Sequence, residues 1–181
     1  EKAYFQTYNI LDFGAKSGEF FVNTESINNA IKECANKGGG TVLIPKGEYI
    51  SGTIHLKSNV NLHLETGSFL IGSLDIDDYG VMPDGYYYSG KNLMGLIFAN
   101  DVENISITGE GVLDGRGTSF MKKNTRFAPS KEQRKYTRQK EKFRDDIKLE
   151  DGPLEYNERP GHILTILSLI HISEPTRPSV I

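Results

Sequence analysis

From Thr41 onward, the chain is a succession of short β-rich segments whose apolar residues recur at about every second position. Gly, Asn, Asp or Pro stands in nearly every gap between the segments, and these residues favour turns. The spacing differs from that of strands alternating with helices, so a doubly wound α/β sheet is excluded. The segments are residues 41–44, 53–56, 60–64, 69–71, 96–98, 105–107 and 111–113.

A weak internal repeat indicates how these segments pack. Residues 59–72 begin Asn-Val-Asn-Leu, and residues 104–115 begin Asn-Ile-Ser-Ile and follow the same pattern with one residue of slippage. One copy cannot bury its apolar face alone, so stacked coils that share a core are the natural solution. We predict an all-β fold, a right-handed parallel β-helix, with a sandwich of β-hairpins as the alternative. Asn59 and Asn104 are interpreted as turn formers, and a ladder of stacked Asn side chains is the alternative.

An amphipathic helix is predicted before the β-rich region. Asn23 or Thr24 provides its N-cap, apolar residues recur at positions 27, 30, 31 and 34, and three consecutive glycines at 38–40 end it. We expect this helix to cap the first coil, after a short strand within residues 8–13. Cys34 lies on the apolar stripe and is predicted to be a buried thiol, and as the single cysteine it excludes an internal disulfide.

The net charge of −3 hides two opposite regions. Residues 122–144 contain ten Lys or Arg and two acids, a local charge of +8, so the rest of the chain carries −11. This basic region falls within a predicted insertion at about residues 118–158, and residues 73–94 are predicted to form a long loop. The basic region lacks interleaved aromatic residues, so no nucleic-acid partner is expected. No run of 18 apolar residues exists, so no membrane span is expected either.

Three stretches of the sequence resemble one family of enzymes. They are residues 9–15, residues 38–67, and residues 104–117, which end Gly-Val-Leu-Asp-Gly-Arg-Gly. The pair Arg159-Pro160 resembles the opening of a further coil. On these residues the chain is similar to the N-terminal part of the polygalacturonase-type glycoside hydrolases of family twenty-eight, which degrade pectin on a pectin-lyase-like β-helix.

The resemblance implies one β-helix domain, of which residues 1–167 form the N-terminal part with the first coils only. Residues 168–181 differ from the continuation that the family would have. They look like the peptide that translated sequencing-adapter read-through produces, so we expect a non-native tail on a truncated chain.

The chemistry that the resemblance implies is inverting hydrolysis of α-1,4-galacturonosidic bonds, in which one carboxylic acid protonates the leaving oxygen and another carboxylate activates a water. The family's Asn-Thr-Asp, Gly-Asp-Asp, Gly-His-Gly and Arg-Ile-Lys motifs do not occur in this sequence. We therefore assign no catalytic residue and expect this chain alone to be inactive. The pairs Asp77-Asp78 and Asp145-Asp146 are not interpreted as catalytic, because adjacent strand residues point to opposite faces. Asp114 is interpreted as a structural turn residue.

Two features are candidates for substrate contact. Tyr86, Tyr87 and Tyr88 offer aromatic faces to a sugar ring, and packing of their loop on the solenoid wall is the alternative. The basic insertion could attract polygalacturonate over a distance, and a solvated helix is the alternative. His55 and His63 are expected to face outward without a metal, since no third ligand has a suitable spacing. No cofactor is expected.

The expected partner is a pectic polysaccharide, either polygalacturonate or rhamnogalacturonan. The full-length protein is expected to be monomeric and secreted or periplasmic. Two other functions are weighed against the hydrolase: a pectate-lyase-like enzyme that cleaves by β-elimination with Ca²⁺, and a non-catalytic carbohydrate-binding or adhesin-like β-helix. The match over residues 52–67 favours the hydrolase over the lyase.

Overall fold

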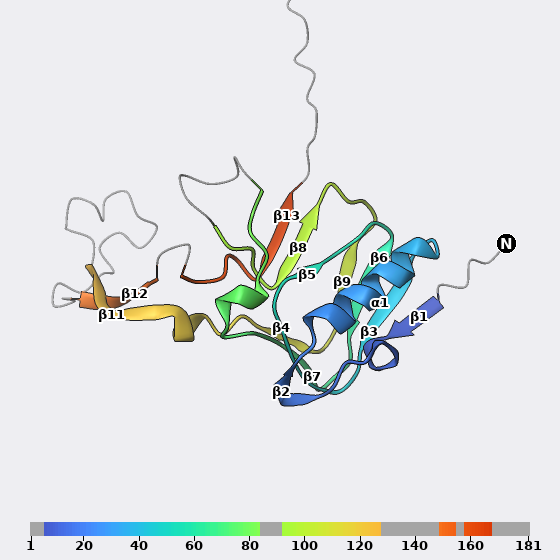
Figure 1. Ribbon diagram of the computed structural model, residues 1–181, viewed down its shortest axis with the longest axis horizontal. Helices are drawn as coiled ribbons and strands as arrows, with labels where there is room; N and C mark the ends of the chain where they lie inside the picture. Colours follow the sequence, from blue (N-terminus) through green and yellow to red (C-terminus); the bar gives the residue numbers. More distant parts are fainter. Residues whose placement is uncertain (1–5, 84–91, 128–148, 155–157, 168–181) are drawn as a thin grey trace, which may run out of the picture.

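A computed structural model describes residues 6–83, 92–127, 149–154 and 158–167 (Figure 1). Eleven of its strands form three parallel sheets, and the chain visits sheets A, B and C in turn. The parallel pairing confirms the predicted β-helix and contradicts the hairpin sandwich, because hairpins pair antiparallel. Sheet A contains β1 (Gln6–Asn9), β3 (Gly40–Ile44), β6 (Val60–Leu64) and β9 (Ser106–Gly109); sheet B contains β2 (Gly18–Val22), β4 (Gly47–Ser51), β7 (Ser68–Gly72) and β10 (Val112–Asp114); sheet C contains β5 (Ile54–His55), β8 (Ile97–Asn100) and β13 (Leu164–Leu167).

The predicted repeat is confirmed by the register of the strands. In sheet A, Asn61 pairs with Ser106, and in sheet B, Phe69 pairs with Val112. Asn59 and Asn104 have positive φ angles of 64° and 52°, so they form turns. The Asn104 Nδ2 also donates to the Asn59 Oδ1 over 3.0 Å, so the turn and the ladder that were alternatives occur together.

The predicted helix is α1 (Thr24–Asn36), and it occupies the place of a sheet C strand in the first coil. Its apolar stripe is completely buried, including Cys34, as predicted. Two polar side chains bond the backbone beside it: the Thr24 Oγ1 accepts from the Gly52 N–H (2.7 Å), and the Asn28 Oδ1 accepts from the His55 N–H (2.8 Å). The Asn28 Nδ2 donates to the Thr53 carbonyl (3.0 Å). Asn28 thus pairs with the edge of β5 as a neighbouring strand would, which protects that edge.

The N-cap prediction is correct in position and wrong in mechanism. Asn23 is the N-cap residue, but its side chain makes no capping hydrogen bond. Instead, the buried Asn23 amide bonds the backbone of three other segments, accepting from the Lys16 N–H (2.7 Å) and donating toward the carbonyls of Lys16 (3.0 Å), Phe21 (2.9 Å) and Ile50 (3.4 Å). This residue therefore joins the loop before β2 to β4.

The strand predicted within residues 8–13 is only partly correct, because β1 ends at Asn9 and a 3-10 helix, η1 (Ile10–Phe13), follows. The Asn9 side chain accepts from the Leu11 N–H over 3.0 Å and turns the chain there. Gly14, at a φ of 90°, ends η1. β2 and β4 were not predicted, and neither were the two strands of the antiparallel ribbon in the second insertion.

Both long insertions leave the solenoid at the same corner, between sheets B and C. The first, between β7 and β8, contains the 3-10 helix η2 (Ile76–Asp78). The second, between β10 and β13, contains η3 (Gly117–Phe120) and an antiparallel ribbon that projects to the left of Figure 1. The ribbon strands are β11 (Met121–Phe127) and β12 (Leu149–Pro153). Among the described residues, no helix is long and apolar enough to cross a membrane.

Thr53 fastens both ends of the first insertion to the solenoid. Its side chain is 2% exposed; the Oγ1 donates to the Gly95 carbonyl (3.0 Å) and accepts from the Gly80 N–H (3.0 Å). We expect Thr53→Val to lower the free energy of unfolding by about 1–3 kcal/mol, because it leaves two backbone groups unsatisfied without changing the shape of the side chain. Urea denaturation measures this change.

The control is Thr66→Val. The exposed Thr66 hydroxyl donates to the Glu110 Oε2 (2.9 Å), and its loss should change stability by less than about 0.5 kcal/mol. Equal effects of the two substitutions would show that Thr53 does not fasten the insertion.

Candidate functional site

The corner between sheets B and C holds two adjoining hollows. The first is a cavity of about 160 Å³ whose lining includes Tyr79, Phe120, Met121, Arg159 and Ile163. The second is a wider open groove of about 730 Å³, which shares Gly117 and Met121 with the cavity. Leu74, Asp114, Arg116, Thr118 and Ser119 complete the lining of the groove. Because loops at one corner of a rigid scaffold are where binding residues gather, this corner is the candidate site.

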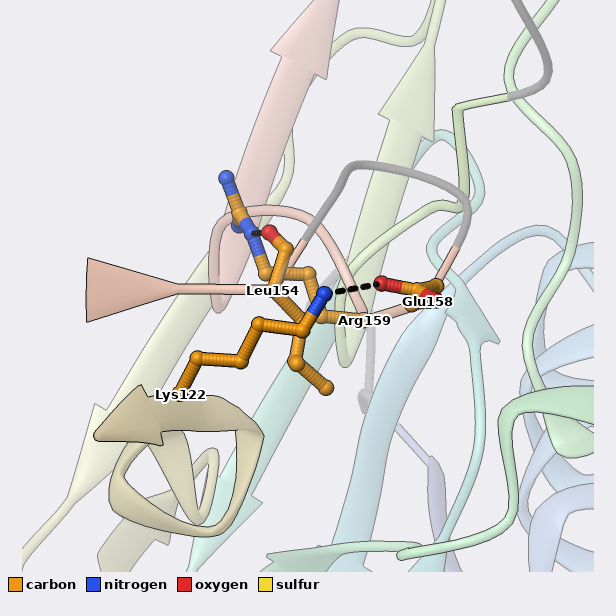
Figure 2. A network of polar contacts seen from close by, with 4 residues as sticks. All are labelled: Lys122, Leu154, Glu158 and Arg159. Carbon is orange, nitrogen blue, oxygen red and sulfur yellow. Dashed lines mark hydrogen bonds and ion pairs between the residues drawn. The ribbon is translucent and has the colours of Figure 1, made fainter. Parts of the chain in front are cut away.

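Four contacts fasten the base of the ribbon beside the cavity, and Figure 2 draws two of them, Arg159 with Leu154 and Lys122 with Glu158. The Arg159 Nε donates to the Leu154 carbonyl (2.8 Å), and its Nη1 donates to the Pro160 carbonyl (3.3 Å). The Leu154 N–H donates to the Phe120 carbonyl (2.9 Å), and Lys122 forms an ion pair with Glu158 at 3.5 Å. The backbone bonds position the cavity wall, whereas the half-exposed ion pair contributes little to stability.

Tyr79 forms the wall of the cavity on the side of the first insertion. Its hydroxyl donates to the Ser73 carbonyl (2.8 Å), and its side chain is 6% exposed. Burial, together with the nearby Asp78 carboxylate, raises the pKa of Tyr79 to about 12, although the Arg116 charge acts in the opposite direction. Tyr79 is therefore a protonated hydrogen-bond donor at neutral pH and not a base.

Two of the carboxylates noted in the sequence, those of Asp78 and Asp114, have structural partners. Asp77 and Asp78 lie in η2, where the Asp78 Oδ2 accepts from the Ser73 hydroxyl. The Asp114 Oδ1 accepts from the Arg116 N–H (2.8 Å), which is the turn bond expected of it. Asp145 and Asp146 lie outside the described residues.

The two histidines considered as metal ligands, His55 and His63, lie on different faces of the solenoid. His55 lies on the outer face of sheet C, with its ring centroid 5.8 Å from that of Phe98. Desolvation of the ring by its neighbours, followed by the charge of Lys57, lowers its pKa. His63 lies on sheet A, where its Nδ1 is 2.8 Å from the Thr108 Oγ1. Within the described residues no group of three or more potential metal ligands is found.

The predicted substrate contacts Tyr86, Tyr87 and Tyr88 lie outside the described residues, as does most of the basic insertion. The sequence also did not single out Tyr79 or Arg116 as site residues. The usable signal was the position of the two insertions, because each follows the second strand of a coil and must therefore leave from the same corner. The order of the strands along the chain is therefore enough to predict that the insertions within residues 73–96 and 115–163 start at the same corner.

The chain is similar to several known proteins over part of their length. The chain is 38% identical to the hyperthermoactive exopolygalacturonase from Thermotoga maritima, with a TM-score of 0.55 over 61% of this chain and 25% of that one. It is 35% identical to the family 28 exopolygalacturonase of Yersinia enterocolitica, with a TM-score of 0.59 over 71% and 26% of the two chains. The exo-poly-α-D-galacturonosidase of Dickeya chrysanthemi is 35% identical over 60% of this chain and 19% of its own length.

The sheets, the capping helix and the structural neighbours define the chain as a right-handed parallel β-helix of the pectin-lyase-like class, as predicted. The chain belongs to the rhamnogalacturonase A/epimerase, pectate lyase-like family, whose model matches residues 7–132. The expected similarity to polygalacturonase-type enzymes is confirmed. The chain spans only about a fifth to a quarter of the length of the curated relatives that it matches.

Proposed function

We propose that this chain forms the N-terminal coils of a glycoside hydrolase that cleaves α-1,4-galacturonosidic bonds of pectic polysaccharides by inverting hydrolysis. The observation that carries the proposal is the similarity to enzymes named exopolygalacturonase at 35% and 38% identity, with TM-scores of 0.59 and 0.55. Residues 52–67, the stretch that favoured a hydrolase over a lyase, lie within the region 7–132 that the family model matches. We also propose that the enzyme is secreted or periplasmic, a location that fits a pectic substrate.

We further propose that the catalytic carboxylates come from coils that this sequence does not contain. Inversion requires a general acid and a general base on opposite sides of the sugar, and the four catalytic motifs of the family are absent here. The last coil supports this proposal. Leu164 is in register with the fully buried Ile97, and Ile166 with the fully buried Ala99, yet Leu164 and Ile166 are 42% and 54% exposed. A further coil would cover these side chains.

The part of the enzyme that these residues would supply is a scaffold and one wall of the substrate-binding surface. α1 closes one end of the core, and the corner between sheets B and C holds the two hollows. Residues 1–167 then form a single stretch of one domain, with residues 118–158 as an insertion. Residues 168–181 are proposed to be foreign to it.

The test compares the 181-residue chain with the protein encoded by the complete reading frame of the source gene. The complete protein should release reducing ends from polygalacturonate with inversion of the anomeric configuration, whereas the 181-residue chain should release none. An unsaturated product that absorbs in the ultraviolet would identify a β-eliminating lyase instead. Binding of polygalacturonate without any turnover by the complete protein would identify a non-catalytic carbohydrate-binding β-helix.

A further inference from the structure

Arg116 differs from the other residues that line the groove in its backbone conformation and in the partners of its side chain. It is one of four non-Gly residues with a positive φ angle among the described residues, at 48°. Such a conformation costs about 1–3 kcal/mol and persists only where the surroundings impose it. Here the Asp114 carboxylate, which accepts from the Arg116 N–H, and the Ser119 N–H, which donates to the Arg116 carbonyl (2.9 Å), hold the turn.

The guanidinium of Arg116 has no hydrogen bond or ion pair with another residue of the described part of the chain. The residue is only partly exposed, and it lines the groove. A guanidinium that has no acidic partner among the described residues favours an anion from solution, and its planar donors fit a carboxylate. Asp114, which lies in the same groove, uses one carboxylate oxygen for the turn and keeps the other as an acceptor.

The remaining lining of the groove suits a sugar ring. Thr118 and Ser119 contribute hydroxyl groups, and Leu74 and Met121 contribute apolar surface. Leu74 is 52% exposed and Met121 is 38% exposed, so both present apolar area to a ligand. Small-molecule sites in general combine a few placed polar groups with apolar contact in this way.

We propose that this groove is a subsite for one hexuronate unit, in which Arg116 binds the sugar carboxylate and Asp114 accepts a hydrogen bond from a hydroxyl group of the same sugar. The proposal rests on the proposed function, since it deepens the account of substrate binding by the same enzyme. A neutral sugar would leave Arg116 without an anionic partner. A small dianion such as phosphate would be repelled by Asp114 more strongly than a single sugar carboxylate and would leave the apolar surface uncovered.

The test is isothermal titration calorimetry of the 181-residue chain with oligogalacturonate and with the fully methyl-esterified oligomer of the same length. We expect the free acid to bind at least about tenfold more tightly than the ester, and Arg116→Gln to abolish this preference. Arg116→Lys should keep part of the preference, because it keeps the charge and loses the bidentate geometry. Lys37→Gln, which removes one positive charge from an exposed ion pair with Glu33, is the matched control and should leave both affinities unchanged.

The outcomes separate this subsite from the proposed function. If the wild-type chain binds acid and ester equally, the hexuronate subsite is wrong while a pectic ligand stands. If Arg116→Gln keeps the full preference, Arg116 is not the carboxylate-binding residue and the proposal is overturned. If the wild-type chain binds neither oligomer, the subsite is again excluded, and activity of the complete protein on polygalacturonate then decides the proposed function independently.

Discussion

Gly52→Ala is expected to be among the most destabilising single substitutions in this chain, lowering the free energy of unfolding by at least about 3 kcal/mol. A Cβ at position 52 would lie 1.8 Å from the Asp78 carbonyl oxygen and 2.5 Å from its carbonyl carbon. These are backbone atoms of η2, so no rotation of a side chain relieves the overlap. The first insertion would have to move away from β4, and that movement would break the Thr53 N–H bond to the same Asp78 carbonyl (3.3 Å).

Two other glycines provide matched controls for this prediction. A Cβ at Gly117 would meet nothing within 4 Å, so Gly117→Ala should change stability by less than about 0.5 kcal/mol. Gly38 has equally open space but a φ of 93°, so Gly38→Ala isolates the cost of backbone strain, about 1 kcal/mol. Thermal and urea denaturation should show that Gly52→Ala is the least stable of the three variants, followed by Gly38→Ala and then by Gly117→Ala. A Gly52→Ala variant as stable as Gly117→Ala would show that the insertion does not pack closely against β4.

The sequence was sufficient to predict the β-helix because its signals are local and repeated. Alternating apolar residues, such as Val42 and Ile44 in β3 or Leu62 and Leu64 in β6, point inward in successive coils and are almost fully buried. β2 gave no comparable signal, because its Phe20, Phe21 and Val22 are 44–85% exposed at the edge of sheet B. Its position is determined by pairing with β4 and by Asn23, which are long-range contacts without a local pattern.

The candidate site was less predictable than the fold because its residues are brought together by topology. Tyr79 and Arg116 are far apart in the sequence and neither belongs to a recognisable catalytic motif. They approach because the chain returns to the same corner one coil later, which places the first insertion beside the start of the second. The coil period that predicts the fold therefore also predicts the position of the corner. It does not predict which side chains line the cavity and the groove there.

Asn23→Ala is expected to lower the free energy of unfolding by about 3–5 kcal/mol, because several backbone groups lose their partner in a site where water does not replace it. The Asn23 side chain is 2% exposed and accepts from the Lys16 N–H while donating toward three carbonyls. Asn29 is the matched control: it lies in α1, the helix that Asn23 precedes, and is exposed, so Asn29→Ala should change stability by less than about 0.5 kcal/mol.

Asn23→Asp tests the donating half of this network separately. The introduced carboxylate still accepts from Lys16, but its second oxygen faces the Lys16 and Phe21 carbonyls, where Asn23 supplies N–H groups. The repulsion favours the protonated carboxyl, so its pKa in the folded state should rise above the unfolded value of about 3.9. The stability that protonation provides is therefore complete below about pH 3.9 and is lost as the pH rises through the folded pKa. Urea denaturation from below about pH 3.9 to neutral pH should show Asn23→Asp becoming steadily less stable relative to the wild type as the pH rises. The exposed Asn29→Asp control should follow the wild type. A pH-independent difference between Asn23→Asp and the wild type would mean that the three carbonyls do not depend on Asn23 as their donor.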